Sequence, residues 1–119
     1  MKRQLVLLPQ AIAEVEEQAA WWAQHHSREQ AARWLDAIHK QLESIVLFPE
    51  SHPLSAECPS FPFVIRDRLL GLGSRPSHRA VFTIVNHTIF VLTVRRATED
   101  RLGPELSDRF PEHLADDWR

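Results

Sequence analysis

Arginines gather in the middle of this sequence. Residues 61–96 contain six arginines and one acidic residue, Asp67. Residues 1–60 contain five basic and eight acidic residues, and residues 97–119 contain three basic and seven acidic ones. The net charge of −2 argues against a protein that binds nucleic acid over its whole surface. A basic segment between two acidic segments instead predicts a localised anion-binding site.

Two segments rich in Val, Ile, Thr and Phe, at 79–85 and 88–94, indicate a β-hairpin. Asn86 and His87 separate them, and Asn tolerates the left-handed backbone of a tight turn. If Val85 pairs with Thr88, alternate side chains share a face of the hairpin. One face is then expected to carry Arg79, Val81, Thr83, Phe90, Leu92, Val94 and Arg96. The other face is expected to carry Ala80, Phe82, Ile84, Ile89, Val91, Thr93 and Arg95.

This alternation places Arg79 and Arg96 together, at the end of the hairpin away from the turn. Guanidinium groups match phosphate oxygens bidentately, so converging arginines predict a phosphate site. In a ribonuclease the RNA 2′-hydroxyl attacks the adjacent phosphate, and arginines stabilise the charge on the phosphoryl oxygens. The alternative interpretation is that the arginines bind an acidic protein partner or solvate a strand edge. The predicted anion-binding or RNA-binding set is Arg66, Arg68, Arg79, Arg95 and Arg96, with Arg66 or Arg68 reaching the site from the preceding strand.

Groups that could move a proton beside these arginines are scarce. The sequence has no tyrosine and no lysine after Lys40. His78 has a suitable intrinsic pKa and is the predicted general base, next to Arg79 and Arg96 as the other catalytic residues. A regular hairpin would turn His78 to the wrong face, although a β-bulge could reverse this. The alternative is a plain histidine at a strand edge. His87 lies in the turn, remote from Arg79.

The sequence also predicts the helices and strands that position these residues. Residues 5–8 form a short apolar run, which is compatible with a buried strand or with the start of a helix. Apolar residues recur every three or four positions from Pro9 to about His25, which predicts an amphipathic helix. Ser27, with Gln30 three residues later, predicts the start of a second helix that ends near residues 47–48, before Pro49. A proline-rich loop at 49–62 and a strand at 63–70 precede the hairpin.

The resulting order is strand, helix, helix, strand, strand, strand, followed by a possible short helix at 112–118. A helical hairpin that covers one face of a small, mainly antiparallel, twisted sheet makes an α+β domain. The length fits one domain over residues 1–119, with a polar, acidic tail from about residue 103.

Three stretches together resemble the RelE/ParE superfamily of toxins, the family of plasmid stabilisation proteins. They are residues 65–71 (IRDRLLG), 78–84 (HRAVFTI) and 88–97 (TIFVLTVRRA). In that family a strand with a basic residue leads into an apolar hairpin that opens with arginine and closes with a valine–arginine–basic run. The leading helical hairpin, which ends in LFPE at 47–50, is similar too, so the resemblance covers about residues 5–102.

The resemblance implies the toxin of a bacterial type II toxin–antitoxin system, neutralised by a cognate antitoxin that wraps it. Members include metal-independent endoribonucleases that cut mRNA on the ribosome and non-catalytic inhibitors of DNA gyrase. A degenerate homologue that only binds the antitoxin is a third alternative. Because of the arginine cluster, ribosome-dependent mRNA cleavage is the predicted activity. The missing tyrosine and the scarcity of lysines favour the alternative, inhibition of gyrase. Val81, Phe90 and Leu92 are expected to be exposed on the sheet and covered by the antitoxin.

The sequence predicts no cofactor and no metal site. Cys58 is the only cysteine, so it cannot form an internal disulfide and has no partner for a Cys-based metal site. The longest apolar runs are far too short to span a membrane. A cytoplasmic protein with no membrane partner is expected.

Overall fold

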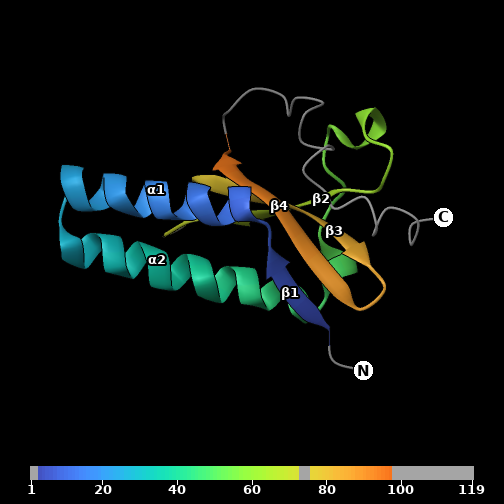
Figure 1. Ribbon diagram of the computed structural model, residues 1–119, viewed down its shortest axis with the longest axis horizontal. Coiled ribbons are helices and arrows are strands. Elements are labelled where there is room, and N and C mark those ends of the chain that lie inside the picture. The colour runs from blue at the N-terminus through green and yellow to red at the C-terminus, as the bar shows by residue number, and fades with distance from the viewer. Residues whose placement is uncertain (1–2, 73–75, 98–119) are drawn as a thin grey trace.

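Two helices cover one face of a four-stranded sheet in the computed structural model, which describes residues 3–72 and 76–97 (Figure 1). The elements are β1 (Gln4–Leu7), α1 (Pro9–His25), α2 (Arg28–Glu43), β2 (Arg66–Leu70), β3 (His78–Val85) and β4 (Thr88–Arg96). The α+β class and the predicted order of elements are confirmed. The expected helix at 112–118 and the acidic tail lie outside the described residues.

The helical hairpin follows the predicted sequence signals closely. Pro9 occupies the first turn of α1, where its missing N–H costs no hydrogen bond. Ser27 caps α2, since its side-chain oxygen accepts a hydrogen bond of 3.0 Å from the backbone N–H of Gln30. The α-helix ends at Glu43 rather than near 47–48, and a 3₁₀ turn over Ser44–Val46 continues the winding. The buried face of α2 carries Trp34, Ile38 and Leu42, which pack on the sheet.

The sheet has the strand order β1-β4-β3-β2, with β1 parallel to β4 and the other pairs antiparallel. Val85 lies opposite Thr88 across the predicted turn, and Asn86 adopts φ 56°, the left-handed conformation that such a turn requires. Because β1 pairs only as far as Val91, no strand among the described residues lies along the outer edge of β4 beyond that point. Helix α1 follows β1 directly and runs past this edge.

A register shift in the β3–β4 ladder changes which arginines face each other. Phe82 lies opposite Val91, but Val81 lies opposite Thr93, so Leu92 is an extra residue on β4. An extra residue inverts the alternation of every side chain that follows it. Consequently Arg95, and not Arg96, lies opposite Arg79. The prediction that Arg79 and Arg96 share a face is wrong, as are the predicted faces of Thr93, Val94 and Arg95.

The chain itself covers the sheet face away from the helices. Val81 and Leu92 are fully buried and Phe90 is 8% exposed. They form a second apolar cluster with Leu8, and with Phe63 and Ile65 from the segment that leads into β2. The prediction that Val81, Phe90 and Leu92 are exposed is therefore wrong. The proline-rich connection folds back over the sheet, because its own apolar side chains need burial as much as those of the strands.

The neighbouring residues Ile65 and Val64 provide a test of this second core. Ile65 is fully buried, whereas Val64 is 53% exposed. We expect Ile65→Ala to lower the free energy of unfolding by about 2–5 kcal/mol, because it removes buried methyl groups and leaves a cavity. The matched Val64→Ala change should alter it by less than about 0.5 kcal/mol. Urea unfolding measures both, and equal effects of the two substitutions would contradict the assignment of Ile65 to a core.

Candidate functional site

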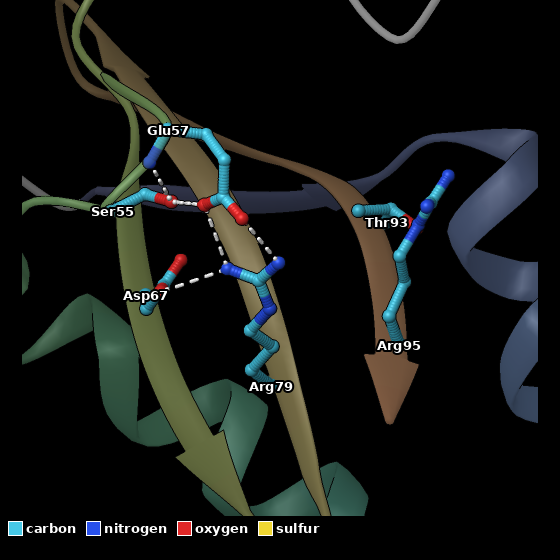
Figure 2. A network of polar contacts seen from close by, with 6 residues as sticks. All are labelled: Ser55, Glu57, Asp67, Arg79, Thr93 and Arg95. Carbon is cyan, nitrogen blue, oxygen red and sulfur yellow. Dashed lines mark hydrogen bonds and ion pairs between the residues drawn. The ribbon is translucent and has the colours of Figure 1, made fainter. Parts of the chain in front are cut away.

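Arg79 of β3 is held by two carboxylates from other parts of the chain (Figure 2). Its Nη2 donates to Oε1 of Glu57 at 2.9 Å and its Nη1 donates to Oε2 at 3.0 Å, which makes the pair bidentate. Nη1 also donates to Oδ2 of Asp67 on β2 at 3.1 Å. The residue is only 7% exposed. Its guanidinium is thus shielded from solvent and neutralised within the chain.

Ser55 fixes the carboxylate that reaches Arg79. The Ser55 hydroxyl donates to Oε2 of Glu57 at 2.6 Å, and the backbone N–H of Glu57 donates back to that hydroxyl at 3.4 Å. The hydrogen bonds from Arg79, with a smaller effect from Ser55, lower the pKa of Glu57 from 4.5 to about 2 against the opposing effect of burial. The same pairing with Glu57 raises the pKa of Arg79. Two carboxylates around one guanidinium leave this site with a net negative charge, which disfavours a phosphate.

The structure also separates Arg66 and Arg68 from Arg79. Both lie on β2 opposite Phe82 and Ala80, so they belong to the face covered by the helices. The Nη1 of Arg66 donates to the backbone carbonyls of His52 at 2.7 Å and Glu50 at 3.2 Å, and so fixes the connection after α2. Arg68 donates to the backbone carbonyl of Leu69.

His52 lies beside these two β2 arginines. Burial, followed by the positive charges of Arg68 and Arg66, lowers the pKa of its imidazole. The lowered pKa favours the neutral form of the imidazole, which adds no positive charge to this part of the sheet.

Three of the predicted site residues do line one cleft, but Arg79 is not among them. Arg95, Arg96 and His78 border a cleft of about 250 Å³ beside α1. His78 is 6% exposed, its Nδ1 lies 2.8 Å from the Ser77 hydroxyl, and its ring packs edge-on to Trp34. Arg96, opposite His78 in the ladder, is exposed. The predicted cluster of His78, Arg79 and Arg96 is thus replaced by one of His78, Arg95 and Arg96.

The sequence did not predict two carboxylates that hold this part of the sheet, Glu57 and Glu14. Glu57 lies in a proline-rich loop 22 residues before Arg79, and no spacing rule connects a loop carboxylate with a strand. Asp67 was visible as the single acidic residue among the arginines, and it does pair with one of them. Glu14 of α1 binds the edge of β4, a contact that depends on how far β1 extends.

No metal centre is evident in the part of the chain that the structure describes, where no three His, Cys, Asp or Glu side chains come together. None of the described helices has the length and apolar character needed to cross a membrane.

A family model for the ParE toxin of the type II toxin–antitoxin system, parDE, matches residues 5–101. The chain belongs to this family. Among solved structures, the toxin is similar to a chain of the chromosomal ParDE toxin–antitoxin system from P. aeruginosa. The TM-score is 0.67 and the identity 18%, over 80% of this chain and 96% of that one.

A mutant of the E. coli toxin RelE in the free state is also similar, with a TM-score of 0.53 and 17% identity over 92% of this chain and 94% of that one. These likenesses show a shared fold. No curated protein sequence matches the chain. The protein is a type II toxin of the RelE/ParE superfamily, and this family implies an antitoxin partner.

The Glu57–Arg79 pair predicts a specific dependence of stability on pH. The pKa of Glu57 is lower in the folded toxin than the ordinary 4.5, so the unfolded chain binds more protons between that pH and about 2. The stabilisation is therefore complete above pH 4.5 and is lost as the pH falls towards 2. We expect Glu57→Gln to lower the free energy of unfolding at pH 7 and to flatten its decline below pH 4.5, as measured by urea unfolding.

Glu16→Gln is the matched control for this prediction, because Glu16 is exposed on α1. It should unfold with the pH dependence of the unmodified toxin. If Glu57→Gln and Glu16→Gln gave the same pH dependence, the ion pair would not form in solution as described.

Proposed function

We propose that the toxin acts by binding and inhibiting a protein target, DNA gyrase, and not by cutting mRNA. The observation that carries this proposal is the neutralisation of Arg79 by Glu57 and Asp67. This arginine was the expected centre of a phosphate site. A guanidinium that already donates to two carboxylates has little affinity left for a phosphoryl oxygen.

The scarcity of groups that could transfer a proton near Arg79 also argues against RNA cleavage. General acid–base catalysis requires a titratable group within hydrogen-bond reach of the reacting oxygens. The sequence contains no tyrosine, and its lysines all lie at or before Lys40. Both carboxylates on the sheet face of Arg79 are engaged by that arginine. Membership of the ParE toxin family is compatible with this proposal, since the superfamily contains gyrase inhibitors as well as mRNA endonucleases.

A ribosome-dependent endoribonuclease is the second candidate function, and one observation favours it. His78 lines the same cleft as Arg95 and Arg96, so an imidazole and two guanidinium groups do share a site. If the toxin cuts RNA, this cleft is the place for the chemistry, and Arg79 has a structural role only.

Two assays on the purified toxin separate the candidates. We expect the toxin to inhibit the supercoiling of relaxed plasmid by gyrase and to leave message intact in a translating extract. Addition of the antitoxin should restore supercoiling, which controls for contaminating inhibitors. Cleaved message together with unimpaired supercoiling would refute the gyrase proposal. Failure of the toxin alone to slow bacterial growth would instead support the degenerate homologue.

A further inference from the structure

The cleft beside α1 lies at the outer edge of β4, beyond the point where β1 stops pairing. Arg95 and Arg96 of β4 line it together with Glu14, Glu17 and Trp21 of α1, and His78 of β3. Consecutive strand residues point to opposite faces of a sheet. Both arginines can reach the cleft because it opens at the strand edge rather than over one face.

A chain of hydrogen bonds holds Arg95 in place. Oε1 of Glu14 accepts from the backbone N–H of Val94 at 3.1 Å and from the hydroxyl of Thr93 at 2.6 Å. The Thr93 hydroxyl in turn accepts from Nε of Arg95 at 3.3 Å. Thr93 is fully buried, so this relay is shielded from water. Figure 2 shows the guanidinium of Arg95 directed along β4 towards Thr93 and away from Arg79.

The relay leaves the two terminal nitrogens of Arg95 for a ligand. Within the described residues neither Arg95 nor Arg96 forms an ion pair, whereas Arg79 on the adjacent strand has two. An arginine that is fixed through Nε and open at both Nη atoms offers a carboxylate two parallel donors. Because Thr93 and Glu14 already restrict its side chain, binding would lose little conformational entropy.

The remaining walls of the cleft indicate what carries that carboxylate. Trp21 is 37% exposed and supplies an aromatic surface. Glu17 brings a negative charge into the same cleft, and no ion pair to it occurs in the described part of the chain. Positive, negative and aromatic groups in about 250 Å³ suit a few side chains of a peptide. The repeated negative charge of a nucleic acid backbone would meet Glu17 as well as the arginines.

We propose that this cleft binds an acidic side chain of the antitoxin, which Arg95 holds bidentately. The apolar part of the same antitoxin segment packs on Trp21, and a basic or amide group of that segment faces Glu17. Thr93 and Glu14 act as positioning residues for Arg95. The inference concerns the antitoxin partner and does not depend on whether the toxin inhibits gyrase.

The test uses the complex of the toxin with its cognate antitoxin and measures the dissociation constant of that complex. Loss of a charge-assisted hydrogen bond costs ~1.5–3 kcal/mol, so Arg95→Ala should weaken binding roughly 10- to 100-fold. Arg33→Ala is the matched control, because Arg33 is exposed on α2, outside the cleft. It should bind as the unmodified toxin does. Equal affinities for Arg95→Ala and Arg33→Ala would overturn the proposal.

Two substitutions of Thr93 test whether its hydroxyl positions Arg95. Thr93→Val removes the hydroxyl that holds Arg95 and should weaken antitoxin binding, whereas Thr93→Ser should retain it. If both bind alike, the relay does not position Arg95. Thermal unfolding of each variant separates a loss of binding from a loss of folding.

Glu17→Gln separates a peptide from a nucleic acid. It should weaken binding of the antitoxin if the cleft holds a peptide of mixed charge. Tighter binding of a single-stranded RNA probe by Glu17→Gln, lost again on adding Arg95→Ala, would assign the cleft to nucleic acid and overturn the proposal.

Discussion

The bidentate ion pair between Glu57 and Arg79 ties the connection after α2 to the centre of the sheet. With Glu57 held in place, Phe63 and Ile65 of the same connection cover Val81 and Leu92. A largely buried ion pair of this kind need not add net stability, but removing one partner would leave the other charge uncompensated. The pair therefore fixes one path for the loop, and that path decides that the sheet face away from the helices is core rather than a binding surface.

One extra residue in β4 determines which face of the sheet the last side chains of that strand occupy. Leu92 shifts the ladder by one position, and every later side chain on the strand changes face. Arg95 comes to lie opposite Arg79, where two guanidinium groups on neighbouring strands would repel each other if both were free. The carboxylates of Glu57 and Asp67 neutralise one of them, and the hydrogen bond to Thr93 turns the other towards the strand edge. Arg79 thus belongs to a buried ion-pair network, whereas Arg95 is directed to the strand edge.

The helices, strands and turns could be predicted from the sequence, whereas the contacts of the site could not. The reason is the distance along the chain between the interacting residues. The helices, the Ser27 cap and the Asn86 turn depend on neighbours within four residues, and local periodicity reports such neighbours well. Glu57, which pairs with Arg79, lies 22 residues from it along the chain. Glu14, which accepts from the Thr93 hydroxyl that holds Arg95, lies 79 residues from Thr93. Nothing in the strand pattern of β4 marks Leu92 as the bulged residue. Faces predicted from regular alternation therefore hold up to Leu92 and fail after it.

The end of β1 explains why a cleft exists at the β4 edge at all. Because β1 spans only Gln4–Leu7, the N–H of Val94 has no strand to donate to within residues 3–72 and 76–97, and a buried N–H without an acceptor is costly. The carboxylate of Glu14 supplies the acceptor that a further strand would have supplied. A side chain fills less space than a strand, however, so the edge remains open next to Trp21 and Glu17. The short first strand, the acidic face of α1 and the fixed arginine are thus parts of one arrangement, in which a structural acceptor also prepares Arg95 for a partner.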